Sequence, residues 1–521
     1  EIFANGGFDI VVGNPPYVKE YTAKSAFNGL HNHEIYQGKM DLWYFFGWLG
    51  LNISKNNSYI SYIAPNNWIT NTGASKFRNY VLDNSKILEY IDFGDYKVFE
   101  DAGIQTMIYL MKNTKNNKEY TVNYLKLNDK NLSLSEVQKF IRKENFDGIS
   151  HFTSIIKREE CKNNYILFLD NFVNNILKKI EESKEFYLEK EEIAQGIVPN
   201  PDVINSRNIL KISDEKVKKY DIKIGDGVFT FEKNYLKNLS EKEKNTLKPL
   251  YEPENFKRYS FNNKNNKVII YLNKKIEDEE NYRNILGHLE KYREIMDERR
   301  ENLSGSREFY QLHWGRDISF FEKGIKIISL RKCVERPVFS YTSEEVFVML
   351  SFNVIKTKKI DMKKLVAILN SKLIKFWLLH RGKMQGDIFQ VDKEPLLEIP
   401  LKTPSDKMTL SVDKMLSLNK ELQEKVLSFQ RLLTRKFELE KLSTKLQDWY
   451  LLDFSEFIKE LKKAKIKLSL KDEMEWEEIF LEKKEEAEKV KNEIEITDKE
   501  IDGMVYELYG LNEEEIRIVE S

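Results

Sequence analysis

FDIVVGNPPY, residues 8–17, is the stretch that decides the fold of this chain. Its first half, residues 8–12, is apolar and rich in β-branched residues, and Gly13 bounds it, which predicts a buried strand. Pro15 and Pro16 end that strand, because a proline has no N–H to donate to a ladder. An amide, a backbone carbonyl and an aromatic ring are therefore expected together at the carboxyl end of a strand, where open α/β sheets bind their ligands.

The side chains of this turn suit one kind of chemistry. An exocyclic amino group of a nucleobase is a weak nucleophile, because its lone pair is delocalised into the ring. The Asn14 side-chain oxygen and the Pro15 carbonyl can each accept one N–H and so aim the remaining lone pair at an electrophile. Tyr17 offers a face on which the base can stack once it is flipped out of a duplex. The alternative is that Asn14-Pro15-Pro16 is only a turn that ends a strand.

Three further strands are predicted downstream, separated by segments of helical character. They span residues 59–65, 87–93 and 106–111. The aromatic and apolar segment 41–51 and the segment 75–82 are predicted to be helices that pack on the sheet. Strands that alternate with helices indicate an α/β fold.

Asn14-Pro15-Pro16-Tyr17 after a strand resembles motif IV of the S-adenosylmethionine-dependent amino-methyltransferases, in its adenine-N6 form. The cytosine-N4 enzymes usually carry Ser in place of this Asn. Later motifs of the family are matched in the same order: Asp41-Leu42-Trp43 resembles motif V, Ile63-Ala64-Pro65-Asn66-Asn67-Trp68 motif VI and residues 91–106 motif VIII. The resemblance implies catalytic roles for Asn14, Pro15, Pro16 and Tyr17. It also implies that Tyr17 and Phe99 stack on the target base, with Tyr96 as the alternative to Phe99.

The family's cofactor site needs a glycine-rich turn and an acidic residue, both upstream of motif IV. This chain begins at Glu1, shortly before Asn14, and shows neither feature there. The resemblance therefore implies the carboxyl-terminal half of a Rossmann-like methyltransferase sheet, with four of its seven strands present. S-adenosylmethionine would bind mostly to a missing amino-terminal portion or to a separate chain, with Asn14 as the one contact predicted here. The strand at 8–12 would then expose an apolar edge.

Length and composition set wider bounds. A chain of 521 residues is too long for one hydrophobic core, and its 84 basic and 84 acidic residues give a net charge of zero. Two distant cysteines, Cys161 and Cys333, predict no disulfide framework, and the six histidines form no metal motif. The sequence has no apolar run long enough to span a membrane and no signal peptide, which predicts a bacterial cytoplasmic protein.

Residues 191–402 resemble the TaqI-like specificity domain that follows the catalytic domain in this family. The matching segments are Gln195-Gly196-Ile197, Leu247-Lys248-Pro249-Leu250-Tyr251, Lys326-Ile327-Ile328, Leu369-Asn370-Ser371-Lys372 and Glu398-Ile399-Pro400. We therefore predict four domains. They are the carboxyl-terminal half of a catalytic domain at 1–120, a helical connector at 121–190, a mixed α/β target-recognition domain at 191–402 and a helical, coiled-coil-like region at 403–521.

Basic residues in the predicted recognition domain indicate double-stranded DNA as the partner. Such residues neutralise phosphates and set the register of a protein on a duplex. The alternative for any one of them is an ordinary solvated surface charge. Residues 382–387 are predicted to form a flexible loop that reaches a groove. The predicted DNA-binding residues are Lys323, Lys326, Arg331, Lys332, Lys372, Lys375, Arg381 and Lys383.

Together these features predict a site-specific DNA adenine-N6 methyltransferase that resembles the type IIG restriction–modification enzymes, in which methylase and nuclease share one chain. Mg²⁺ would be needed only if a nuclease domain lies upstream. The first alternative is a truncated or split DNA-binding and specificity subunit, inactive without an amino-terminal portion that binds S-adenosylmethionine. The second is a glutamine methyltransferase acting on protein. That class also uses Asn-Pro-Pro-Tyr, but it lacks the long segment that follows the motif here.

Overall fold

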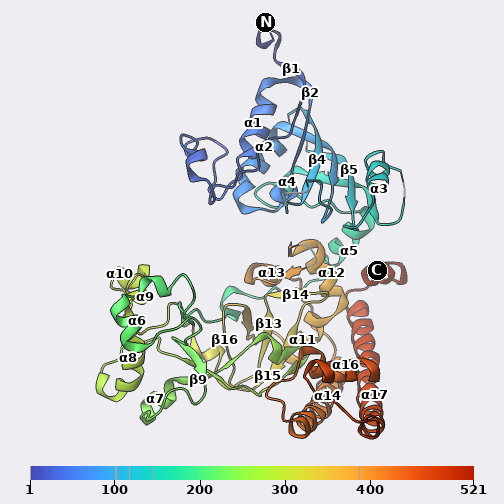
Figure 1. Ribbon diagram of the computed structural model, residues 1–521. Coiled ribbons are helices and arrows are strands. Elements are labelled where there is room, and N and C mark those ends of the chain that lie inside the picture. Colours follow the sequence, from blue (N-terminus) through green and yellow to red (C-terminus); the bar gives the residue numbers. More distant parts are fainter. Residues whose placement is uncertain (1, 100–102, 116–117, 145, 386–387) are drawn as a thin grey trace. The chain divides into compact units, whose positions relative to one another are not determined.

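The structure is a computed structural model that describes residues 2–99, 103–115, 118–144, 146–385 and 388–521. It divides into two compact units, Glu1–Lys179 and Ile180–Ser521. Figure 1 shows the chain coloured from its amino terminus in blue to its carboxyl terminus in red.

The first unit is built on a six-stranded mixed sheet with the order β1-β2-β4-β3-β5-β6. β1 runs parallel to β2 and β3 runs parallel to β5, whereas the other neighbouring pairs are antiparallel. The first four strands in the sequence are the ones that the residue pattern predicts, and the α/β fold class is confirmed. The strands are β1 (Phe8–Gly13), β2 (Ser54–Pro65), β3 (Ser85–Asp92), β4 (Thr106–Asn113), β5 (Glu119–Leu127) and β6 (Ile149–Lys157).

Helices cover both faces of this sheet (Figure 1). Helices α1 and α2 pack on β2 and β3 over an aromatic core that includes Tyr90 and Tyr124. Their neighbours Ile91 and Leu125 belong to a second core together with residues of α3, because successive strand residues point to opposite faces. The helices of this unit are α1 (Trp43–Ile53), α2 (Ser75–Asn84), α3 (Leu134–Ile141) and α4 (Arg158–Cys161), and α5 (Asn171–Glu182) continues into the second unit.

The sheet extends further along the chain than the sequence pattern predicts. Most of β5 and all of β6 lie in residues 121–190, where we predicted a helical connector. Among the described residues of that segment, the α-helices are α3, α4 and α5. Tyr120, Val122 and Tyr124 of β5 are buried while the residues between them are more exposed. The first half of β5 shows this strand period of two, and from Tyr124 onward residues on both faces are buried, Leu125 and Leu127 in the core under α3.

The second unit contains several small sheets. Two four-stranded sheets, with the orders β16-β9-β12-β8 and β15-β13-β17-β7, share one hydrophobic core that includes Ile269 and Val354. Separate sheets pair β10 with β11 and arrange three strands in the order β14-β19-β18. The strands are β7 (Ile193–Gln195), β8 (Thr230–Glu232), β9 (Leu247–Tyr251), β10 (Phe256–Lys257), β11 (Ser260–Phe261), β12 (Lys267–Ile270), β13 (Lys326–Leu330), β14 (Lys332–Val334), β15 (Phe339–Thr342), β16 (Phe347–Val348), β17 (Phe352–Ile355), β18 (Lys383–Gln385) and β19 (Ile388–Gln390).

This mixed α/β region also contains short α-helices and a close contact between two backbone segments. Gly196, which follows β7, lets the chain pass directly against Met349, because a Cβ at Gly196 would lie 1.8 Å from the Met349 carbonyl oxygen. The helices are α6 (Asp214–Tyr220), α7 (Glu241–Thr246), α8 (Arg283–Glu290), α9 (Arg293–Asp297), α10 (Arg300–Leu303), α11 (Met362–Asn370), α12 (Lys372–Arg381) and α13 (Lys393–Leu397).

The carboxyl-terminal region is helical, as predicted. Helices α14 and α17 pack along each other, and ion pairs of Lys414 with Glu493 and of Lys425 with Glu486 show that they are antiparallel (Figure 1). Phe429, Trp449 and Phe480 are buried where α14, α17 and the turns between them meet. The helices are α14 (Lys407–Phe437), α15 (Thr444–Gln447), α16 (Phe454–Lys463), α17 (Leu470–Leu508) and α18 (Glu513–Glu520).

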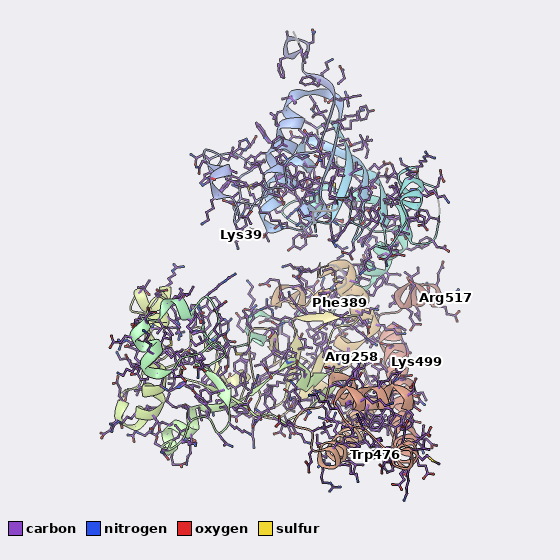
Figure 2. The ribbon with its side chains drawn as sticks, in the orientation of Figure 1. Lys39, Arg258, Phe389, Trp476, Lys499 and Arg517 are labelled. Carbon is purple, nitrogen blue, oxygen red and sulfur yellow. The ribbon has the colours of Figure 1, made fainter. Side chains whose placement is uncertain are left out.

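Buried and half-buried charged side chains fix α17 to the strands and helices of the same unit. Asp498 accepts a hydrogen bond from Arg258 and a second one, at 3.0 Å, from Nη1 of Arg336. Figure 2 labels Arg258 and also Lys499, which follows Asp498 in the sequence. Asp502, one turn further, is buried and accepts a 2.8 Å hydrogen bond from the backbone N–H of Lys372. Its Oδ1 lies 3.5 Å from Nη2 of Arg336, and its Oδ2 has no partner among the described residues. Burial raises the pKa of Asp502 to about 6.

Candidate functional site

Asn14 to Tyr17 follow the carboxyl end of β1, and one hydroxyl ties them to the neighbouring strand. The Tyr17 hydroxyl lies 2.9 Å from the Asn14 side-chain oxygen and 2.9 Å from the backbone carbonyl of Ile63 in β2. Because a phenol has one proton, it donates to only one of these oxygens at a time. Pro15 is buried and Asn14 is exposed, so the turn is anchored while the amide stays accessible to a ligand.

Phe99 is the second aromatic ring at this site. Its ring centroid lies 6.3 Å from that of Tyr17, with the ring planes at 59°. Tyr96, the alternative, packs instead against the core beneath α3. A base stacked between two parallel rings needs about 6.8 Å between them, twice the 3.4 Å stacking distance. The two rings are tilted and slightly closer than this, so one of them has to turn by roughly 59° and move outward before a base fits between them.

A buried carboxyl lies near Tyr17. Asp41 is 5% exposed, and its Oδ1 has no hydrogen-bond partner among the described residues. Burial raises the pKa of Asp41, although backbone N–H groups, that of Trp43 first, partly oppose the shift. Burial, and to a smaller extent the charge of Asp41, raises the pKa of Tyr17 to about 12. Tyr17 therefore keeps its proton at neutral pH and acts as a hydrogen-bond donor.

The end of β2 is joined to the end of β3 by side chains that sequence reasoning did not assign. The Asn66 side-chain amide donates a 2.9 Å hydrogen bond to Asp92, and the Tyr90 hydroxyl donates to the Asn66 carbonyl at 3.0 Å. Asn66 directly follows Pro65 at the end of β2, the same strand-then-turn pattern that marks Asn14 after β1. These bonds link the end of β2, the neighbour of β1, to the end of β3.

The predicted DNA-binding residues of the second unit differ in exposure. Lys323, Lys332 and Lys383 are exposed, whereas Lys375 and Arg381 are half-buried. Of these five, only Lys383 approaches a carboxylate within the described part of the chain, with its Nζ 3.9 Å from Asp392. The three exposed lysines therefore carry charge that is available to a partner.

Three other predicted DNA contacts already have partners inside the protein. Arg331 pairs with Asp392 at 2.6 Å and Lys372 with Glu520 at 2.9 Å. Lys326 is 0% exposed, and its ammonium group donates a hydrogen bond to the carbonyl of Glu344. Burial lowers the pKa of Lys326 to about 8. A solvent-facing contact with DNA was predicted for Lys326, and the structure contradicts it, because β13 turns this side chain inward.

The segment predicted as a flexible loop forms strands. Residues 383–385 are β18 and residues 388–390 are β19, while Gly386 and Asp387 lie outside the described residues. Gln385 and Gln390, which sequence reasoning did not assign, lie on these strands. The signal that could have found them is the alternation of polar and apolar residues in Lys383-Met384-Gln385 and Ile388-Phe389-Gln390.

The described residues form no metal site, disulfide or membrane-spanning helix. No three His, Cys, Asp or Glu side chains among them gather closely enough to hold a metal ion. Cys161 and Cys333 are both buried, and in the described part of the chain neither forms a disulfide. No described helix is at once long and apolar enough to cross a membrane.

Comparison with protein families assigns most of the chain. Residues 1–99 match the family model of the Eco57I restriction-modification methylase, and residues 207–401 match that of the TaqI-like C-terminal specificity domain. Residues 402–505 match a domain of unknown function, DUF8810. The resemblance seen in the sequence is confirmed for both the methylase region and the specificity domain.

Two curated relatives illustrate how much of the sequence is shared. The type II restriction enzyme and methyltransferase RM.Eco57I of Escherichia coli is 27% identical over 141 residues, 26% of this chain and 13% of that relative. The type II methyltransferase M.HincII of Haemophilus influenzae is 21% identical over 419 residues, 76% of this chain and 74% of the relative.

Among solved structures, the type IIL restriction-modification enzyme MmeI in complex with DNA is 11% identical, with a TM-score of 0.48. The type IIG restriction endonuclease BpuSI is 14% identical, with a TM-score of 0.31. The matches cover 92% and 97% of this chain but only 57% and 55% of those two proteins, so this chain spans little more than half their length.

Proposed function

We propose that this chain, which carries an Eco57I-type restriction–modification methylase region and a TaqI-like specificity domain, takes part in site-specific transfer of a methyl group to N6 of adenine in double-stranded DNA. The observation that carries the proposal is the cluster of Asn14, Tyr17 and Phe99, in which an accessible amide oxygen lies beside two aromatic rings. The enzyme would be part of a type IIG restriction–modification system.

In the proposed complex, polar groups of the Asn14 turn bind the amino group of the flipped adenine, and the two aromatic rings bind its faces. The Asn14 oxygen and the Pro15 carbonyl accept the two N6 hydrogens, which leaves the nitrogen lone pair directed at the methyl donor. Tyr17 and Phe99 hold the base by stacking, which is worth about 1–3 kcal/mol per base elsewhere. When adenine arrives, the Tyr17 hydroxyl turns its proton from Asn14 to the Ile63 carbonyl, which lies equally close. The acceptor on Asn14 is thereby released without an unpaired donor.

S-adenosylmethionine is the proposed cofactor, and it would supply the methyl group. The residues of this chain fit the acceptor side of such a site and not the donor side. The Gly225-Asp226-Gly227 sequence lies in a turn before β8, not between a strand and a helix. Asn14 is the one contact to the cofactor that we propose within the chain.

The donor side is proposed to adjoin β1, supplied by an amino-terminal portion or a separate chain. In the described part of the molecule β1 pairs only with β2, and Ile10 and Val12 on it are 65% and 74% exposed. A strand with one free edge and exposed apolar side chains is suited to pair with further strands. This feature also favours the alternative that the chain by itself is a DNA-binding specificity subunit.

DNA would be held by the specificity domain, within the proposed limits 191–402. The exposed Lys323, Lys332 and Lys383, with Lys375 and Arg381, are the proposed contacts to phosphate and base. Each phosphate contact that is lost should lower the slope of log affinity against log salt concentration by about 0.9.

Methylation-aware sequencing of DNA exposed to the intact protein tests the proposal, because it reports the modified base and its sequence context together. We expect N6-methyladenine in one short sequence. Asn14→Ala should lower the methylation rate by at least about a hundredfold, comparable to the loss of one positioning group in other active sites, with DNA binding kept. Asn56→Ala, at the far end of β2, is the matched control. Methylation of cytosine, or an unimpaired Asn14→Ala variant, would refute the proposal.

Binding of S-adenosylmethionine to this chain alone separates the two forms of the proposal. No measurable binding, with specific DNA binding intact, supports a donor side supplied from elsewhere. Tight binding together with adenine methylation by residues 1–521 would show that the donor side has been misplaced.

A further inference from the structure

We infer that the outer face of the small sheet β14-β19-β18 reads an A·T base pair in the major groove, an inference that rests on the proposed function and assigns its sequence specificity. The six outward residues of this sheet are called the reading face here. They are Lys332, Val334, Lys383, Gln385, Ile388 and Gln390.

The two faces of the sheet differ in burial. Cys333, Phe389 and Met384 stand opposite one another on the three strands, and the first two are almost fully buried. Figure 2 labels Phe389, on the central strand. The residues on either side of each of these three are more exposed, because successive strand residues point to opposite faces. The buried row thus anchors the sheet and leaves the reading face open.

The strand register puts three of the four polar residues of the reading face in one row. Lys332 and Lys383 both stand opposite Gln390, one on each side. Neighbouring strands lie about 4.8 Å apart, so the two lysines start about 10 Å from each other. The major groove is about 12 Å wide. Gln390 can therefore face base edges while the two ammonium groups reach toward the phosphates that border the groove.

Gln385 and Gln390 form a preset pair. The Gln390 side-chain amide donates a 2.9 Å hydrogen bond to the Gln385 side-chain oxygen, which also lies 3.5 Å from the Lys332 ammonium group. The Gln390 oxygen and the Gln385 amide nitrogen have no other partner within the described residues. The pair thus offers one acceptor and one donor from fixed positions. Adenine presents the complement on its major-groove edge, with its N6 amino group as donor and N7 as acceptor.

Apolar residues of the reading face suit the thymine of the same base pair. Val334 and Gln385 both stand opposite Ile388, and Val334 is 65% exposed. The thymine 5-methyl group is the apolar feature of the major groove. No carboxylate occurs among the six outward residues, and the Asp392 carboxylate near Lys383 also pairs with Arg331.

The partner is therefore specified by chemistry. An adenine meets the glutamine pair, its thymine meets Val334, and Lys332 and Lys383 contact phosphates on the two sides of the groove. This adenine belongs to the recognition sequence and is distinct from the target base, which must leave the duplex to be methylated.

Selection of bound sequences from a random duplex library by the intact protein tests this inference without requiring catalysis. We expect Gln390→Ala and Gln385→Ala to bind the wild-type sequence with one A·T position relaxed, and discrimination there reduced at least about tenfold. Gln390→Glu replaces the amide by an acceptor-only group, so adenine at that position should lose its preference and cytosine gain it. Lys332→Ala should weaken binding to all sequences and flatten the salt dependence.

Gln423→Ala on α14 and Lys264→Ala, an exposed lysine in the turn before β12, are the matched controls, and thermal unfolding of each variant checks its fold. The inference is overturned if the folded Gln385 and Gln390 variants, singly and together, select the wild-type sequence with full discrimination. It is also overturned if they lose affinity equally for every sequence. If wild-type protein methylates adenine in one sequence while these variants keep its specificity, only the inference fails. If wild-type protein neither selects nor methylates any sequence, the proposed function fails as well.

Discussion

Replacing Asp502 in α17 by asparagine is expected to stabilise the protein at neutral pH. Burial raises the pKa of this carboxyl from 3.8 to about 6, so its ionisation is less favourable in the folded protein than in the unfolded chain. At about 1.36 kcal/mol for each pKa unit, the folded state loses about 3 kcal/mol when Asp502 ionises. An asparagine side chain at this position would keep an oxygen for the Lys372 N–H, from which Asp502 now accepts a hydrogen bond at 2.8 Å, and would carry no charge.

The pH dependence gives the prediction its sign. Between about pH 4 and pH 6 the folded protein holds a proton on Asp502 that the unfolded chain has released, so this contribution to stability falls as the pH rises. Below about pH 4 both states are protonated, and above about pH 7 both are ionised. The stability difference between Asp502→Asn and wild type should therefore grow from near zero at low pH to about 3 kcal/mol at pH 7.

Urea unfolding from pH 4 to pH 8, together with hydrogen exchange of the α17 amides, measures this difference. Asp498→Asn, one turn away, is the contrasting variant. Asp498 bonds both Arg258 and Arg336, so its loss should destabilise the protein by roughly 3–5 kcal/mol. If Asp502→Asn lowers stability at pH 7, or if the difference does not vary with pH, the attraction of Arg336 for Asp502 outweighs its burial and the reasoning is wrong.

Two further predictions concern single side chains. Tyr17→Phe keeps the stacking ring and loses a hydrogen bond worth about 1 kcal/mol, so the methylation rate of the intact enzyme should fall less than about tenfold. The rate of Tyr17→Ala, which also loses the ring, should fall further. Equal losses of rate in single-turnover assays would mean that the hydroxyl matters more than the ring. Gly196→Ala places a Cβ 1.8 Å from the Met349 carbonyl oxygen, so it should lower the thermal unfolding temperature of the specificity region, and an unchanged temperature would show that β7 can shift away.

The sequence predicts the residues of the candidate site more completely than it predicts the strands of the sheet that carries the site. Asn14, Tyr17 and Phe99 were assigned together, and the structure brings Tyr17 within hydrogen-bond distance of Asn14 and next to Phe99. The motif could be recognised in the sequence because an asparagine, two prolines and a tyrosine directly follow a predicted strand. β5 was missed because its buried Tyr120 and Val122 alternate with polar residues, and such alternation is weak against a background of charged, helix-forming residues.

The predicted DNA-binding residues show what sequence reasoning could not determine. Lys326 and Lys332 have the same charge and lie six positions apart, yet one is buried in β13 and the other is exposed on β14. Composition cannot separate them, because the direction of a strand side chain depends on register. The pairing of Gln385 with Gln390 likewise depends on the hairpin that aligns them.

Buried and exposed residues alternate along the strands of the small sheet β14-β19-β18, and this affects which substitutions the protein can tolerate. Cys333 and Phe389 carry the packing, while the six residues of the reading face contribute little to the core. Substitutions on the outer face can therefore accumulate at small cost in stability, since surface changes usually stay within about 0.5 kcal/mol. With the proposed role of this face, one or two codon changes there would be enough to alter the recognised sequence while the fold is kept.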